Sequence, residues 1–345
     1  MDTVSLFLGI QIQPRSAGLF LTQSHYARDI LQSAGLDSSK PVNTPISPKE
    51  SKTKTATATH EDPTFYRQIA GSLQYLTITR PDIAFATNVI CQHMHCPTTS
   101  DFKRLKRLLR YIRGTQDYGL PITTGPLTLT TYSDADWASN TDDRKSITGF
   151  CSYLGPNLIS WSVKKQSIVA KSSTEAEYRA LVAATSDVIW LRRLLHDFHA
   201  SQSAPTTIFC DNISAIALSN NPIFHARTKH IEIDHHFISD HINRKAIEVA
   251  HINFADQPAD ILTKPITGKR FSELRTKLTI CRSDDQLAGG VKVFHIPPSA
   301  HHTDCSTSHD LCHQWSGSDL QHLFDIPTTC LLVLYRTHLL YMAER

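Results

Sequence analysis

The chain has 345 residues, 40% of them apolar and 19% charged, so it can bury a core and is not globally disordered. Its net charge of +3 does not by itself indicate nucleic-acid binding. MDTVSLFLGIQIQ lacks the basic segment of a secretory signal, and CLLVLY at 330–335 is far too short to span a bilayer. Eight cysteines without a repeated spacing are typical of reduced thiols, so we expect an intracellular protein that is not secreted.

Residues 1–120 are predicted to be mainly helical after a short opening strand. FYRQIAGSLQYLTITRPDIAFATNVICQHM predicts one helix ending near Arg80 and a second beginning at Pro81. SDFKRLKRLLRYIRGT predicts a third helix with Ser100 as its N-cap and Gly114 at its end. The polar stretch at 43–64, rich in Pro, Thr and Lys, predicts a loop.

Residues 121–280 have the pattern of a mixed α/β sheet. Three β-rich segments, LTLTTYSDADW, SITGFCSYLG and NLISWSVKK, precede a long helix at about 174–199. A strand (TTIFCD), a helix from about Ile213, a helical segment (HHFISDHINR) and another strand (AIEVAHINF) follow, and PADILTK is predicted to open the last helix. This order predicts helices packed against a mixed sheet. Residues 281–345 show no sustained period, and we expect an irregular tail.

Four acidic residues are predicted to meet at one edge of that sheet. Asp134 stands near the end of the first strand, with Asp136 on the same strand face, and Asp211 directly follows TTIFC. Asp260 lies in the first turn of the predicted last helix. Glu177 shares its helix stripe with apolar positions, whereas Glu175 lies in a largely polar row. The apolar positions in the Glu177 stripe are Leu181, Ala184, Val188, Leu191 and Leu195.

Each acid also has a purely structural interpretation. Thr174 with Glu177, or Ser172 with Glu175, fits a capping box, and the pattern does not choose between them. Asp211 could cap a helix, and Asp260 could interact with a helix dipole. As a set, however, four clustered carboxylates require cations, and oxygen ligands favour Mg²⁺ or Mn²⁺ over zinc. Two such ions, about 4 Å apart, would activate a water and stabilise the leaving oxygen of a phosphodiester.

Several long motifs resemble the ribonuclease H domain of copia-type retrotransposon Pol polyproteins. They are YSDADWA, RKSITGFCSYLG, ISWSVKKQSIVAKSSTEAEYRAL, CDNISAIALSNNPIFHARTKHIEIDHHF and QPADILTKP, in the family's order. Upstream, YRQIAGSLQYLTITRPDIAFATNVI and LKRLLRYIRGT resemble the end of the reverse transcriptase and its connection to that domain. The resemblance runs from about Phe7 to about Gly290.

The resemblance implies a ribonuclease H-like three-layer α/β/α fold with a mixed five-stranded sheet at 121–280. It implies cleavage of the RNA strand of RNA–DNA hybrids during reverse transcription, with two Mg²⁺ ions (Mn²⁺ possible) held by Asp134, Glu177, Asp211 and Asp260. Residues 1–120 would be a remnant of the reverse transcriptase. A YVDD-like polymerase segment is not found, so no polymerase activity is expected. The alternative is a truncated, non-catalytic relic that at most binds nucleic acid.

The expected partners are an RNA–DNA hybrid and the remainder of a Pol polyprotein, in a cytoplasmic particle or the nucleus, with no membrane contact. Predicted nucleic-acid-binding residues are Lys103, Lys106, Arg107, Arg110, Lys164, Lys165, Ser172, Ser173, Asn212, Arg227, Lys229 and His230. The alternatives are a solvated amphipathic face for the 103–113 helix and structural packing for Arg227, Lys229 and His230. CQHMHC at 91–96 and HHTDCSTSHDLCHQ at 301–314 lack the paired spacing of a zinc site, so no zinc is expected.

Overall fold

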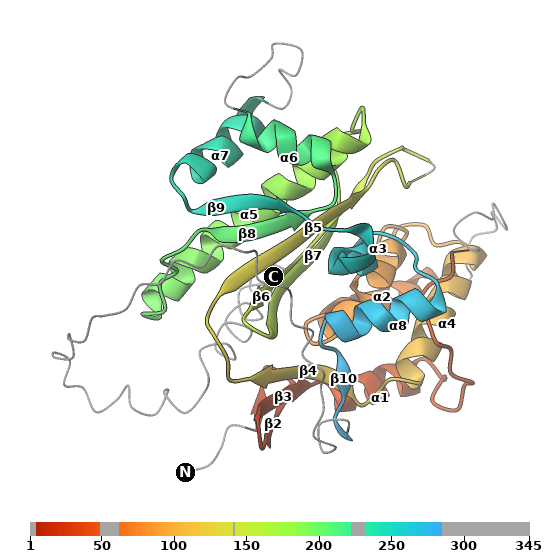
Figure 1. Ribbon diagram of the computed structural model, residues 1–345. Coiled ribbons are helices and arrows are strands. Elements are labelled where there is room, and N and C mark those ends of the chain that lie inside the picture. Colours follow the sequence, from red (N-terminus) through yellow and green to blue (C-terminus); the bar gives the residue numbers. More distant parts are fainter. Residues whose placement is uncertain (1–4, 49–61, 141, 222–231, 285–345) are drawn as a thin grey trace.

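Two five-stranded sheets, each covered by helices, organise the protein (Figure 1). The computed structural model describes residues 5–48, 62–140, 142–221 and 232–284. The predicted tail therefore lies almost entirely outside the described residues. None of the helices in the described ranges is long and apolar enough to cross a membrane.

The first sheet joins the beginning of the chain to its later parts. Its strands are antiparallel and run in the order β1 (Leu6–Phe7), β2 (Ile10–Arg15), β3 (Gly18–Thr22), β4 (Tyr118–Thr123) and β10 (Cys281–Arg282). The prediction of one short opening strand missed the β2–β3 hairpin, although IQIQ at 10–13 alternates buried and half-buried residues as a strand does. The predicted boundary at residue 120 cuts through β4.

Among the described residues between the hairpin and β4, the chain forms mainly helices. They are α1 (Ser24–Ser33), α2 (Pro63–Leu76), the short 3₁₀ helix η2 (Pro81–Ile83), α3 (Ala84–Cys91) and α4 (Thr99–Arg113). Helix α4 ends before Gly114 as expected, but its N-cap is Thr98 and not Ser100. Thr98 and Asp101 form a reciprocal capping box, which satisfies two backbone N–H groups at once and outcompetes a cap two residues later.

The second sheet has the predicted mixed five-stranded form. Its order is β7 (Asn157–Lys165), β6 (Ile147–Leu154), β5 (Leu129–Asp136), β8 (Thr206–Cys210) and β9 (Ile247–His251). Strands β5, β6 and β7 form an antiparallel meander, whereas β8 lies parallel to β5, and β9 parallel to β8. Helix α5 (Ser173–Asp197) connects β7 to β8, and α6 (Ile213–Asn220) and α7 (Glu232–Asn243) lie between β8 and β9.

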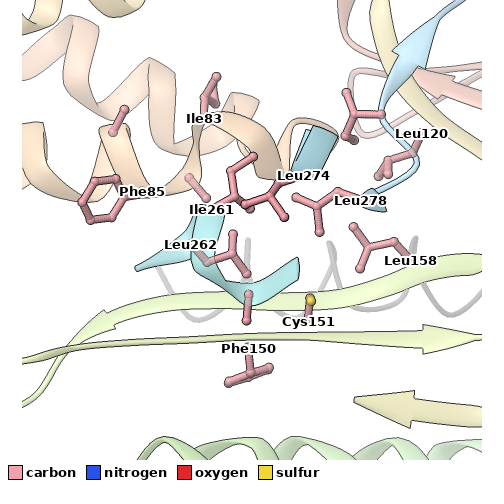
Figure 2. Close-up of a cluster of buried hydrophobic side chains, with 14 of the residues drawn as sticks. Ile83, Phe85, Leu120, Phe150, Cys151, Leu158, Ile261, Leu262, Leu274 and Leu278 are labelled. Atoms are coloured by element: carbon pink, nitrogen blue, oxygen red, sulfur yellow. The ribbon is translucent and has the colours of Figure 1, made fainter. Parts of the chain in front are cut away.

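Helices cover both faces of this sheet, which gives the three predicted layers. Helix α5 packs on β5, β6 and β8, while the other face meets α3 and the 3₁₀ helix η5 (Pro258–Leu262), which follows the short η4 (Phe254–Asp256). Figure 2 shows Ile261 and Leu262 of η5 between β6 and the helices that carry Ile83 and Leu274. The ribonuclease H-like α/β fold is thereby confirmed.

The segment PADILTK does not begin the last helix. It forms η5, whose last residue is Leu262, and the final helix α8 (Gly268–Lys277) starts separately. Helix α8 packs against the earlier helices, with the Phe271 ring edge-on to Tyr111. Because buried residues of both sheets belong to one hydrophobic cluster, the first 120 residues and the ribonuclease H-like part share a core.

Candidate active site

The four predicted acids come together at one edge of the second sheet. Asp134 lies on β5 and Asp211 directly follows β8, so the parallel pairing of these strands places the two acids at neighbouring strand ends. Carboxylate oxygens of Asp134, Asp211 and Asp260 lie within 4.8 Å of one another. Glu177, Cys210 and Asp211 form a second group with the same spacing. Asp211 belongs to both groups and therefore links all four acids.

At the start of helix α5, Glu175 and Glu177 have different roles. The Ser172 hydroxyl accepts a hydrogen bond from the Glu175 backbone N–H, and the Glu175 carboxylate accepts one from the Lys171 backbone N–H. Glu175 also forms an ion pair with Arg179 at 3.0 Å, which neutralises it although it is buried. Glu177 plays no part in the cap and points toward β5, so the cap-only interpretation of Glu177 is wrong.

Asp211 is likewise not a helix cap. The side chain of Asn212 caps α6 by accepting a hydrogen bond from the Ala215 backbone N–H at 2.9 Å. This leaves the half-buried Asp211 carboxylate available at the sheet edge. It also gives Asn212, predicted to bind nucleic acid, a structural role in the fold.

Asp260 reaches the site because η5 lies directly on the sheet. Gly149 pairs with Asp134 across β5 and β6, and a Cβ atom at Gly149 would stand 2.6 Å from the Thr263 side chain and 2.8 Å from that of Leu262. Glycine therefore permits the close approach of η5 at this point. The Gln257 amide donates a hydrogen bond to the Ser133 carbonyl at 3.0 Å and ties the start of η5 to β5.

A lysine that sequence reasoning did not identify lies inside the cluster. The Lys264 Nζ atom is 2.8 Å from Asp260 Oδ1 and 3.3 Å from each Asp134 carboxylate oxygen. The Thr263 hydroxyl donates to Asp134 Oδ2, and Arg270 lies 3.7 Å from Asp260 Oδ2. The sequence carried one usable signal: Lys264 follows Asp260 by four residues, a spacing that brings side chains together on a helical turn.

The cluster is electrostatically unfavourable without added positive charge. Burial, together with the charges of Asp134 and Asp211, raises the pKa of Glu177 to about 9. Burial and Asp134 also raise the pKa of Asp211, and they raise the pKa of Asp260 to about 6. Burial alone would lower the pKa of Lys264, but Asp134 and Asp260 outweigh it and raise that pKa. These shifts favour a bound cation at the site.

The residues fit a hard divalent cation. Four carboxylates supply oxygen ligands, the type that Mg²⁺ and Mn²⁺ prefer. Both Asp260 oxygens are buried, and each lies beside a cationic side chain, Oδ1 beside Lys264 and Oδ2 beside Arg270. Asp136 belongs to neither acid group found within the described ranges, and burial raises its pKa to about 6.

Two arginines on the basic face of α4 also contact the preceding segment of the chain. The Arg107 guanidinium donates to the Thr44 hydroxyl at 2.8 Å, and Arg110 donates to the Lys40 carbonyl at 2.7 Å. Both arginines therefore hold the segment before residue 45 against α4. Lys103 and Lys106 remain exposed, with the Lys106 ammonium over the Phe102 ring at 4.7 Å.

The other predicted contact residues differ in their availability. Lys164 and Ser173 are exposed, whereas Lys165 forms an ion pair with Asp143 at 2.9 Å and Ser172 caps α5. Arg227, Lys229 and His230 lie outside the described residues, as does the His- and Cys-containing stretch at 301–314.

No family model matches the chain. A retrovirus-related Pol polyprotein from transposon RE2 of Arabidopsis thaliana is 42% identical over 293 residues, 85% of this chain and 20% of the relative. The corresponding polyprotein from transposon TNT 1-94 of Nicotiana tabacum is 36% identical over 273 residues, 76% of this chain and 20% of the relative. An uncharacterized mitochondrial protein of Arabidopsis thaliana is 50% identical over 191 residues, 55% of this chain and 79% of that protein.

Two solved structures illustrate the structural likeness. The N-terminal ribonuclease H domain of a Mycobacterium tuberculosis protein is 12% identical, with 43% of this chain and 96% of that chain covered at a TM-score of 0.31. A foamy viral protease-reverse transcriptase in complex with double-stranded DNA is also 12% identical. The match covers 71% of this chain and 37% of that chain at a TM-score of 0.42. The chain spans about a fifth of the length of the Pol polyproteins it matches. Over most of its length the chain is homologous, at 36–44% identity, to copia-type retrotransposon Pol polyproteins.

Proposed function

We propose that this chain carries a ribonuclease H that cuts the RNA strand of RNA–DNA hybrids during reverse transcription. The observation that supports it most strongly is the meeting of Asp134, Glu177, Asp211 and Asp260 at one sheet edge. Such a set would hold two divalent ions, Mg²⁺ or Mn²⁺, for hydrolysis of a phosphodiester. When bound, these ions supply an activated water and stabilise the leaving oxygen.

The residues of the chain have distinct roles in this proposal. Asp134 and Asp260 are almost fully buried and would fix the ions against the sheet. Glu177 is oriented by the Ala135 backbone N–H, at 3.2 Å, and half-buried Asp211 stands between the two acid groups. Because Asp211 belongs to both groups, it would contribute to holding the ions together with either set of acids.

The hybrid would be bound through its backbone. Exposed Lys103, Lys106 and Lys164 supply positive charge for phosphates, and the Ser173 hydroxyl could hydrogen-bond to ribose 2′-hydroxyls, which distinguish RNA from DNA. The segment before β5, together with α8 and β10, would correspond to the connection with the rest of a Pol polyprotein. That remainder is the proposed partner.

Cleavage of a labelled RNA–DNA hybrid by the purified full chain in Mg²⁺ or Mn²⁺ tests the proposal. We expect cuts in the RNA strand of the hybrid, none in double-stranded DNA, and loss of cleavage in the Asp134→Asn variant. Cleavage that survives this substitution would point to a contaminating nuclease. Hybrid binding without cleavage in either metal would instead support the non-catalytic alternative.

A further inference from the structure

Lys264 occupies the position in the acid cluster where positive charge is most needed. Its ammonium contacts Asp260 at 2.8 Å and both oxygens of Asp134 at 3.3 Å. We infer that Lys264 is a resident counter-ion that a divalent metal must displace, so that this lysine sets the metal affinity of the site. The inference rests on the proposed function, because it concerns the same carboxylates.

The two carboxylates that Lys264 contacts are buried and therefore lack the solvation that water gives an exposed charge. Asp134 is 1% exposed and Asp260 is 0% exposed, and an isolated buried carboxylate is strongly unfavourable. Lys264 compensates both acids with one charge when no metal is bound. The oxygens it contacts are the ligands a metal requires, so lysine and metal compete for the same atoms.

In the same conformation, the Lys264 ammonium also lies near an exposed aromatic ring. The Lys264 side chain is 25% exposed, and its ammonium lies 5.3 Å from the centre of the Phe254 ring, whose residue is 62% exposed. An ammonium over an aromatic face is attracted to the ring while still in contact with solvent. The four-carbon stem of lysine is flexible enough to move away from the acids while the ammonium stays near this ring. Metal binding can therefore displace the ammonium without disturbing η5.

Arg270 is held differently from Lys264, although its guanidinium also lies 5.9 Å from the centre of the Phe254 ring. Its guanidinium is farther from the acids, at 3.7 Å from Asp260 Oδ2, and makes no contact with Asp134. Arg270 also donates to the backbone carbonyls of Ala255 and Phe254, at 2.6 Å and 2.9 Å, which fixes it in place. It therefore contributes positive charge near the site without occupying the metal position.

Calorimetric titration of the metal-free full chain with Mn²⁺ tests the inference directly. The matched variants are Lys264→Met, which keeps the length of the side chain, and Lys264→Arg, which keeps the charge. We expect Lys264→Met to bind Mn²⁺ roughly tenfold or more tightly than wild type, because a competing cation at ion-pair distance is gone. The Mn²⁺ affinity of Lys264→Arg should stay much closer to that of wild type, because the competing charge is kept.

Melting temperatures provide a second readout, in which the loss of Lys264 should weaken the metal-free protein while it strengthens Mn²⁺ binding. In EDTA, Lys264→Met should melt below wild type, because the buried acids lose their counter-ion, and added Mn²⁺ should restore more stability than in wild type. A variant that folds only with Mn²⁺ would support the inference. Should Lys264→Met fail to fold under all conditions, Lys264→Gln would be measured in the same way.

Weaker or unchanged Mn²⁺ binding by the uncharged variants would overturn the inference. If wild type then still cleaves hybrid with Mg²⁺, the proposed function stands and only the role of Lys264 is wrong. Absence of Mn²⁺ binding in both wild type and the uncharged variants would overturn the inference and the metal-dependent function together.

Discussion

The carboxylate of Glu177 on α5 accepts a hydrogen bond from the backbone N–H of Ala135 on β5 at 3.2 Å. Ala135 directly follows Asp134, so this bond fixes the helix carboxylate beside the strand carboxylate. Glu177 is thereby held close to two other acids that repel it. Such an arrangement favours a bound cation over an orientation of Glu177 toward solvent.

Asp134 and Asp136 should differ sharply in their importance for cleavage. Asp134 contributes carboxylate oxygens to the cluster, whereas Asp136 lies two residues farther along β5 and belongs to neither acid group. We expect Asp134→Asn to reduce single-turnover cleavage by more than the roughly 10–100-fold typical of residues that only support metal ligands. Asp136→Asn should reduce the rate of single-turnover cleavage by at most about tenfold. The reverse order of effects would assign the metal to Asp136.

Replacing Glu177 with glutamine should stabilise the metal-free protein while removing cleavage. The Gln oxygen can still accept the Ala135 N–H bond, and the buried carboxyl that must take up a proton beside Asp134 and Asp211 is gone. We expect the free energy of unfolding in EDTA to rise by at least about 1 kcal/mol, the order of an uncompensated buried polar group. Denaturant titration in EDTA and a cleavage assay on the same preparation measure both effects.

The control for this substitution is Glu175→Gln. Glu175 accepts the Lys171 N–H bond and pairs with Arg179, so its replacement should destabilise the protein by about 0.5–1 kcal/mol and leave metal binding intact. A stability loss in Glu177→Gln would mean that the carboxylate is already compensated in the metal-free state.

How far the sequence predicts the site depends on the range of the contacts involved. Glu177 was separated from Glu175 by helical periodicity alone, because burial of a stripe is a local property of one helix. The capping pattern could not decide between them, since Thr174 and Ser172 both offered a hydroxyl three residues before a glutamate. Only the backbone geometry at the start of α5 shows that Ser172 is the cap.

Contacts between distant segments escaped prediction. The position of Lys264 depends on η5 lying against Gly149, which no local pattern encodes. Arg107 and Arg110 form part of an amphipathic basic face in the sequence, but they bind the segment at 40–44 in the fold. The β2–β3 hairpin is different, because the alternation of IQIQ at 10–13 is a local pattern that the sequence does carry.

The lysines of α4 are exposed, whereas two of its arginines contact the segment at 40–44, so the two kinds of residue should affect hybrid binding differently. Lys103 and Lys106 are exposed, so the double variant Lys103→Ala/Lys106→Ala should weaken hybrid binding. If both lysines contact phosphates, the slope of log affinity against log salt should fall by about 0.9 for each lysine. Fluorescence anisotropy at several salt concentrations gives this slope.

Arg110→Ala is the contrasting variant. Because Arg110 donates to the Lys40 carbonyl, its loss should lower the free energy of unfolding by about 1 kcal/mol and leave the salt slope unchanged. A slope that changes in Arg110→Ala and not in the lysine variant would place the nucleic acid over the arginines.

A buried network around Arg80 and Asp82 ties α4 to the segment between α2 and α3. The Arg80 guanidinium donates to both Asp82 oxygens at 2.8 Å and to the Thr115 carbonyl at 2.6 Å. The Tyr111 hydroxyl donates to Asp82 Oδ2 at 2.6 Å. Burial alone would raise the pKa of Asp82, but Arg80 outweighs it and lowers that pKa. Both side chains are almost fully inaccessible to solvent.

Asp82 should therefore make protein stability depend on pH in acid. Its folded-state pKa lies below its unfolded value, so its contribution is present above the unfolded pKa and is lost as pH falls through the folded pKa. At pH 7, Asp82→Asn leaves a buried guanidinium without its counter-ion, and we expect a loss of about 3–5 kcal/mol in the free energy of unfolding. This loss should shrink progressively below about pH 4.

Denaturant titrations of wild type and Asp82→Asn at pH 7, 5 and 3 measure this difference in unfolding free energy. Arg80→Lys is the matched variant, because lysine keeps the charge but cannot donate in parallel to both carboxylate oxygens. It should be less destabilising than Asp82→Asn at pH 7, since the carboxylate still has a cation beside it. A difference between wild type and Asp82→Asn that stays constant from pH 7 to pH 3 would show that packing, and not ionisation of Asp82, accounts for the stabilisation.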